Sequence, residues 1–231
     1  MRQSNFPAII LLNLLGVCLF FSWYLPANHG FWFSLDKSIF YSFNNEMVKS
    51  HAFAIFVAIT NYRGFDVISL LVMAAYFYSF WRNKDSDGRK WMLALGFTML
   101  ITAVVLNQLG HLIPVSHRSP SLFFTDAHRA GALTGIPTKD GSADSFPGDH
   151  GMMLMIYACF MGRYFGRKAF IIGLIILCVF ALPRVMAGAH WFTDISVGSL
   201  SVVLVGLSWC LLTPLTDRII EWIYRKLPGK A

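Results

Sequence analysis

Six apolar runs joined by polar connections restrict the fold of this chain more than any other feature. They span residues 6–25, 52–81, 91–113, 151–161, 169–187 and 192–212. A helix needs about 20 apolar residues to cross the hydrocarbon core of a bilayer, and most of the runs approach or exceed that length. The fourth run is short, but it becomes long enough if its helix begins near Asp149 and continues through Phe165.

The composition favours an integral membrane protein over a soluble globule. Hydrophobic residues make up 56% of the 231 residues and charged residues only 13%, too few to cover a soluble domain of this size. We therefore expect an all-α integral membrane protein in which six transmembrane helices form one bundle, with residues 1–231 as a single domain. The first run exceeds the apolar length of a signal peptide, which favours an uncleaved anchor.

The distribution of Lys and Arg predicts the orientation. Most of the 19 basic residues share one side of the membrane if the N-terminus is cytoplasmic. They lie at Arg2, in the stretches 82–90 and 163–168, and in the tail 218–230, which includes Lys230. Because successive spans cross the membrane in opposite directions, the same orientation places loop 114–149 and residues 184–190 on the outer side. Topology and anionic lipid thus explain the net charge of +7, and we expect no nucleic-acid partner.

Arg184, His190 and Asp194 form the first candidate group of functional residues. They lie between two apolar runs, where ionisable side chains are costly and usually functional. If the segment from Thr193 is helical, His190 and Asp194 share one face, so the carboxylate can hold the Nδ1 proton while Nε2 acts as a nucleophile. The planar guanidinium of Arg184 suits a phosphoryl group under attack.

The stretch 145–150 forms the second group and opens the fourth run. Pro147 and Gly148 precede the expected helix start, where backbone N–H groups can bind an anion. His150 is then placed to protonate a leaving oxygen. One histidine beside an apolar segment is more often a packed residue than a catalyst. Two histidines with an arginine and an aspartate at segment ends favour a catalytic site.

These two groups resemble motifs of the type 2 phosphatidic acid phosphatase superfamily, which contains membrane phosphatases and phosphotransferases. Its third motif, Ser-Arg-x5-His-x3-Asp, matches residues 183–194 with Pro183 in place of the serine. Its second motif, Pro-Ser-Gly-His, corresponds to Pro-Gly-Asp-His at 147–150. By this resemblance His190 would be the nucleophile, Asp194 its orienter and His150 the general acid.

The first motif of the superfamily, Lys-x6-Arg-Pro, is matched only in part. His111 stands in place of the lysine, Arg118 is present, and Ser119 separates it from Pro120. Lys139 is a candidate substitute for the missing lysine, and a solvated loop lysine is the alternative. The expected phosphate-binding set is Arg118, Arg184, Ser145, Gly148 and Asp149.

Two polar or aromatic segments are expected on the outer side. Residues 29–50 are rich in aromatic side chains and predict a segment lying in the interface, either as a simple aromatic belt or as a route for lipid substrates. Loop 114–149 is expected to be functional because it is long and polar. Its histidines at 117 and 128 lack paired ligand spacing, so we expect no metal. Arg63 and Asp66, at i and i+3, form either a structural pair or a headgroup site.

The expected mechanism is a double displacement that needs no cofactor. His190 attacks a phosphoryl group and forms a phosphohistidine, which then passes the group to water or to another lipid phosphate. Segments outside the motifs, including 28–32, 102–110 and 211–215, are similar to the lipid A phosphotransferases of Gram-negative bacteria. That resemblance implies transfer from undecaprenyl diphosphate to the 1-phosphate of lipid A at the periplasmic face of the inner membrane.

Two alternatives stay open at this point. One is an undecaprenyl diphosphate phosphatase, and the other, of a different class, is a transporter. A transporter usually carries its polar groups near the midplane, whereas these map to one face, which favours the enzyme. Lys139, Arg129 and Arg63 are candidates for contacts with the acceptor headgroup. A small regulatory membrane protein is left open as a partner, without a residue that points to it.

Overall fold

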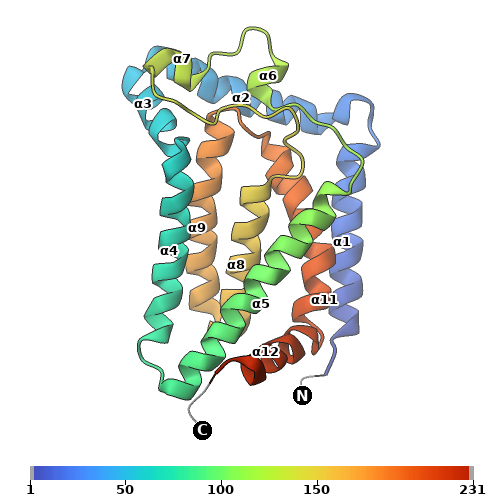
Figure 1. Cartoon of the computed structure of the whole chain (residues 1–231). Helices are drawn as coiled ribbons and strands as arrows, with labels where there is room; N and C mark the ends of the chain where they lie inside the picture. The colour runs from blue at the N-terminus through green and yellow to red at the C-terminus, as the bar shows by residue number, and fades with distance from the viewer. Residues whose placement is uncertain (1–2, 229–231) are drawn as a thin grey trace.

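The computed structural model describes residues 3–228, and every regular element among them is a helix. The elements that run along the long axis are α1 (Phe6–Tyr24), α4 (Arg63–Trp81), α5 (Ser86–His111), α8 (Asp149–Phe165), α9 (Arg167–Met186) and the composite segment Asp194–Leu211. Both ends of the described chain lie at the same end of this bundle (Figure 1). Arg2 and Lys230, which contributed to the predicted orientation, lie outside the described residues.

The predicted all-α membrane bundle is confirmed, with one difference in the number of spans. Within residues 3–228, five helices are long and apolar enough to cross a membrane, namely α1, α4, α5, α9 and Asp194–Leu211. The sixth predicted span is α8, whose 17 residues fall just below that length. It begins at Asp149 and ends at Phe165, so it includes the extension beyond run 151–161 that the sequence analysis required for a span.

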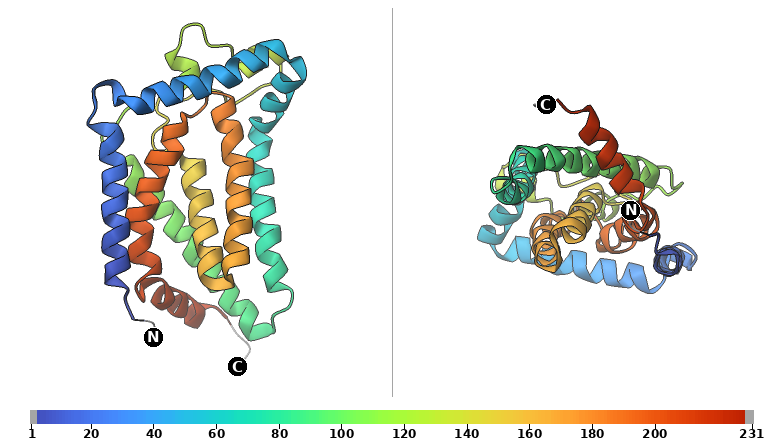
Figure 2. Two further views of the ribbon diagram at one scale, coloured as in Figure 1. Left: turned by 180° about the vertical axis from the view of Figure 1, so that it is seen from behind. Right: turned by 90° about the horizontal axis from the view of Figure 1, so that it is seen from below.

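Helix α8 lies inside the bundle and packs along α9, as the view from below shows (Figure 2). A Cβ atom on Gly173 of α9 would lie only 2.7 Å from the Cα of Ala158, so the glycine allows the two backbones to approach closely. Because its neighbours cover it, α8 does not need the full length of a lipid-facing span.

The second apolar run is divided into two helices. Helix α3 (His51–Thr60) is followed by its C-cap residue Asn61, and α4 begins at Arg63, two residues after that cap. The side-chain amide of Asn61 donates to Val57 O and to Pro183 O, both at 2.9 Å. The break therefore ties the start of α4 to the C-terminal part of α9, beside Arg184.

A layer of helices covers the end of the bundle away from the chain termini (Figure 1). It contains η1 (Ala27–His29), α2 (Phe31–Lys49), α3, α6 (Pro120–Phe123) and α7 (Ala130–Thr134). Helix α2 crosses the bundle end, and α6 and α7 lie within the predicted loop 114–149. At the opposite end lies α12 (Leu215–Lys226), which packs on α5.

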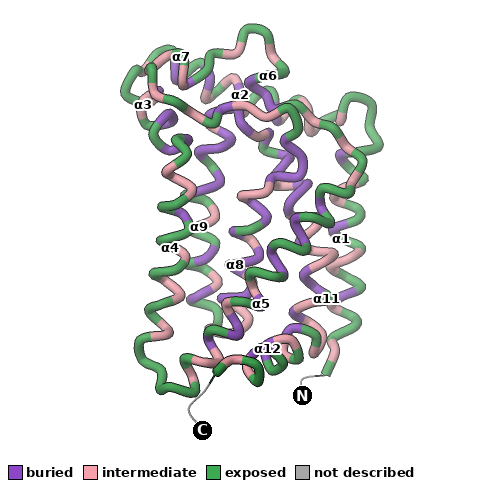
Figure 3. Tube along the Cα trace, viewed as in Figure 1, coloured by how far each residue is buried: buried purple, intermediate pink, exposed green. Residues whose placement is uncertain are grey.

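Buried residues gather between the helices, whereas the outer faces of α1 and α4 are largely exposed (Figure 3). The largest core cluster includes Leu106, Met152, Ile156, Phe160 and Leu207. Apolar side chains such as those on the outer faces of α1 and α4 are stable only where lipid covers them, which is consistent with a multi-pass membrane protein.

The last axial segment is wound with wide, π-type turns. It comprises η2 (Asp194–Ser199), α10 (Leu200–Val202), η3 (Val203–Leu207) and α11 (Ser208–Leu211). Turns of this kind are frequent at functional sites. The first of these turns begins at Asp194, one of the candidate functional residues.

Candidate active site

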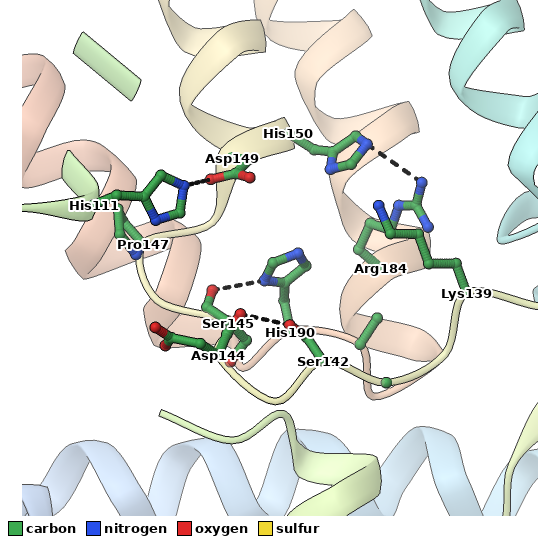
Figure 4. Close-up of a pocket in the computed structure, with 12 residues that line it drawn as sticks. His111, Lys139, Ser142, Asp144, Ser145, Pro147, Asp149, His150, Arg184 and His190 are labelled. Atoms are coloured by element: carbon green, nitrogen blue, oxygen red, sulfur yellow. Dashed lines mark hydrogen bonds and ion pairs between the residues drawn. The ribbon is translucent and has the colours of Figure 1, made fainter. Parts of the chain in front are cut away.

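Polar residues that are distant in sequence meet in a cavity of about 80 Å³ at the end of the bundle covered by α2. Its walls come from the C-terminal ends of α5 and α9, the N-terminal end of α8 and the loops beside them (Figure 4). The lining residues are His111, Lys139, Gly141, Ser142, Asp144, Ser145, Pro147, Asp149, His150, Arg184, Ala189 and His190. One water takes about 30 Å³ of liquid, so the cavity has room for a small anion but not for a whole lipid.

His190 follows a tight turn after α9. Gly188 in this turn has φ +70, and a Cβ there would lie 2.7 Å from the ring of Phe40, so only glycine fits. The Nδ1 atom of His190 lies 3.0 Å from Ser145 O and 3.4 Å from Asp194 Oδ2. Both neighbours are acceptors and favour a proton on Nδ1. Nε2 is then left with a lone pair, and it is turned toward the cavity (Figure 4).

Asp194 is fully buried, and several donors surround its carboxylate. Oδ2 accepts from the Trp191 amide at 2.8 Å, and Oδ1 lies 3.0 Å from Nδ1 of His117. A buried carboxylate is tolerated only when it is paired and hydrogen-bonded in this way. The carboxylate that the sequence assigned to His190 is therefore shared between two histidines.

Arg184 and His150 meet a carboxylate from another helix. Asp66 of α4 forms an ion pair with Arg184 and lies 3.2 Å from Nε2 of His150. Nη2 of Arg184 is itself 3.4 Å from that nitrogen, and Nη1 is 3.5 Å from Asn61 Oδ1. Since Nε2 of His150 is engaged here, Nδ1 is the ring nitrogen available to a ligand. Asp66 was considered only with Arg63 at i+3, and among the ion pairs of residues 3–228 it pairs with Arg184 and His150 instead.

The N-terminal end of α8 lies beside the cavity. No side chain caps its first turn, so its positive dipole end is open toward the cavity that Asp149 and His150 line. The amide of Gly148, proposed from the sequence as an anion donor, instead donates to Asp194 O at 3.0 Å. Gly148 thus joins the start of α8 to the start of η2.

Three further residues named in the sequence analysis, Lys139, Ser145 and His111, also line the cavity. Lys139 and Ser145 line it, and Ser145 uses its carbonyl toward His190 and its hydroxyl toward His117 O. Nε2 of His111, at the first-motif lysine position, lies 2.8 Å from Oδ1 of Asp149 (Figure 4). That position therefore holds a histidine paired with an aspartate.

Three predicted arginines lie outside the cavity wall. Arg118 has an exposed side chain, and its carbonyl accepts from the Trp191 indole at 2.7 Å. Arg129 pairs with the buried carboxylate of Asp140 in the loop beyond the cavity. Arg63 is exposed at the start of α4. Of the predicted arginines, only Arg184 lines the cavity.

A histidine with a free Nε2, backed by a buried carboxylate and set near an arginine, is equipped for phosphoryl transfer through nitrogen. The family model of the PAP2 superfamily matches residues 115–217, which contain His150 and His190 of the cavity. The chain belongs to this superfamily and is a multi-pass membrane phosphotransferase. It is 58% identical over 228 residues to Lipid A 1-diphosphate synthase of Escherichia coli (strain K12), covering 98% of this chain and 96% of that protein. No solved structure matches the chain significantly.

Proposed function

We propose that the protein transfers a phosphoryl group from undecaprenyl diphosphate to the 1-phosphate of lipid A, giving lipid A 1-diphosphate and undecaprenyl phosphate. The observation that carries this proposal is the similarity to Lipid A 1-diphosphate synthase along nearly the whole chain. The cavity supports it because the nucleophile, an arginine and a helix N-terminus converge on a space the size of a phosphoryl group.

The first step uses His190 and His150. Nε2 of His190 attacks the terminal phosphorus of the donor, and the bond from that phosphorus to the bridging oxygen breaks as the P–N bond forms. His150 supplies a proton to the departing oxygen, and Arg184 with the α8 amides stabilises the charge on the transferred group. Undecaprenyl phosphate leaves, and a phosphohistidine remains.

The second step reverses these roles. An oxygen of the lipid A 1-phosphate attacks the phosphohistidine, the P–N bond breaks, and His190 returns to its neutral form. Lys139, exposed at the cavity wall, is the best-placed cation for the acceptor phosphate. Arg118, Arg129 and Arg63 lie farther out and would need to move, or to contact other parts of the headgroup.

We further propose that the cavity faces the periplasm from the inner membrane, with α2 and loop 114–149 at the outer interface. The basic turns and tails support this orientation. Arg82 and Lys84 lie between α4 and α5, and Arg225 lies in α12, at the end of the bundle away from the cavity (Figure 1).

The test is the fate of a labelled terminal phosphate. Purified protein receives undecaprenyl diphosphate with and without lipid A, and label is counted in lipid A, in the protein and in free phosphate. We expect slow turnover with a labelled protein when the donor is alone, and transfer to lipid A when both are present. If free phosphate accounts for all of the donor consumed, the protein is a phosphatase. Flux across sealed vesicles without any phosphate transfer would indicate a transporter.

A further inference from the structure

We infer that His117 is a positioning residue for phosphoryl transfer, because it holds both of the groups that flank Nδ1 of His190. The inference rests on the function proposed above. His117 does not line the cavity, so it acts through Asp194 and Ser145 and not on the substrate.

The ring of His117 holds the carboxylate. Its Nδ1 lies 3.0 Å from Oδ1 of Asp194, and its side chain is only 13% exposed. The other carboxylate oxygen, Oδ2, faces the Trp191 amide and His190. The donor from His117 therefore fixes which oxygen of Asp194 is presented to the nucleophile.

The backbone of His117 holds the second partner of the nucleophile. Its carbonyl accepts from the amide of Ser145 at 2.8 Å and from the Ser145 hydroxyl at 2.9 Å. The carbonyl of Ser145 in turn lies 3.0 Å from Nδ1 of His190. Two separate routes, one through the ring and one through the main chain, thus run from His117 to the same nitrogen.

Aromatic neighbours keep the imidazole of His117 in place. It stacks on Trp191 with ring centroids 5.2 Å apart and an interplanar angle of 18°. It also meets the edge-on rings of Trp23 and His29, at 5.4 Å and 5.5 Å. Trp23 comes from α1 and is completely buried. These contacts on several sides restrict rotation of the ring and keep Nδ1 directed at Asp194.

The shared carboxylate has a chemical consequence. In a double displacement, His190 is the nucleophile in the first step and the leaving group in the second. Asp194 must therefore orient His190 in both steps. Because His117 holds the other carboxylate oxygen, Asp194 keeps one orientation toward His190 throughout.

Two substitutions separate the hydrogen bond from the packing. His117→Asn keeps an N–H donor near the position of Nδ1, whereas His117→Phe keeps an aromatic ring against Trp191 and removes the donor. We expect His117→Phe to lower kcat roughly 10- to 100-fold, by analogy with hydrogen-bond partners that orient metal-ligating histidines, while KM stays nearly constant. His117→Asn should retain most of kcat. His128→Phe, in the same loop but outside the site, is the matched control.

The inference is tested by comparing kcat between the two His117 variants. A kcat that is equal in His117→Asn and His117→Phe, whether both are high or both are low, would overturn it, and so would a change confined to KM. Thermal unfolding of each variant in detergent shows whether a loss of kcat merely follows a loss of fold. The rate of phosphoprotein formation is measured as well. If wild-type protein hydrolyses the donor without phosphorylating lipid A, the proposed function fails, while the effect of His117 on that rate still tests this inference.

Discussion

Asp66 of α4 and Arg184 of α9 form an ion pair at the wall of the cavity, although 118 positions separate them in the chain. Arg184 is nearly buried, with 3% of its side chain exposed, whereas Asp66 is 36% exposed. The Asp66 carboxylate is thus paired with the Arg184 guanidinium, which a phosphoryl group is expected to bind. An incoming phosphate must share the donors of Arg184 with Asp66 or displace it.

Replacement of Asp66 by Asn should therefore tighten donor binding. The variant loses a negative charge that repels the phosphate and competes for Arg184. We expect KM for the donor to fall about fivefold, equivalent to roughly 1 kcal/mol. We also expect a lower kcat, because His150 loses its charged partner. Steady-state kinetics at fixed acceptor concentration measure both values, and an unchanged or higher KM would contradict the competition between Asp66 and phosphate.

Removal of the proposed nucleophile should abolish the covalent intermediate without unfolding the protein. His190→Ala is expected to form no labelled phosphoprotein and to lose at least about three orders of magnitude in kcat. His51→Ala, an exposed histidine at the start of α3, is the control and should behave like wild type. Retention of a tenth of the activity in His190→Ala would rule out His190 as the nucleophile.

Lys139 and Arg129 should give opposite results when each is changed to Met. Lys139 is exposed at the cavity, so its loss should raise KM for the acceptor with little effect on stability. Arg129 is the charged partner of Asp140, which is 2% exposed, so its loss should destabilise the fold by about 1–3 kcal/mol. Kinetics and thermal unfolding of the two variants test the contrast. An Arg129→Met protein with normal stability and a raised KM would instead make Arg129 a ligand.

Asp36 should make stability depend on pH. This residue of α2 is buried against Thr193, and burial raises its pKa from 3.8 to about 6. Because the folded pKa lies above the unfolded one, the folded state binds the proton more tightly between about pH 4 and 6. Its contribution to stability is thus present at low pH and is lost as pH rises through 6. Thermal unfolding across this range should show the loss in wild type relative to Asp36→Asn, and parallel curves would contradict it.

Labelling with a membrane-impermeant thiol reagent tests the orientation. In a background without the native cysteines, Thr125→Cys in the loop near α6 should react from outside intact spheroplasts. Lys84→Cys, between α4 and α5, should react only after permeabilisation. Both side chains are exposed, so access depends on the membrane and not on burial. Reaction of Lys84→Cys from outside would reverse the proposed topology.

Local spacing predicted part of this structure well. The extension of α8 from run 151–161 to Asp149 and Phe165 was expected from the length that a membrane span requires. His190 and Asp194 are four positions apart, and their Nδ1 and Oδ2 atoms lie 3.4 Å apart, although His190 precedes the first helical residue. The break at Asn61 was not predicted, because apolar residues continue on both sides of it.

The partners of the site residues come from distant parts of the chain. Asp66 reaches His150 across 84 positions, and His117 reaches Asp194 across 77. No spacing rule specifies such contacts, since they depend on how the helices pack. The nearest acceptor to Nδ1 of His190 is the backbone carbonyl of Ser145. Every residue has such a carbonyl, so the sequence cannot indicate which one is used.

The neighbourhood of α1 and the last axial segment has a consequence for biosynthesis. The amide of Asn5 donates to Leu212 O at 2.9 Å, and Trp23 of α1 packs near His117 and Phe146. Helix α1 thus depends for its packing on partners that are translated much later in the chain. Because Asp194 begins that later segment, the nascent chain carries no assembled phosphoryl-transfer centre until the segment from Asp194 onward has been synthesised.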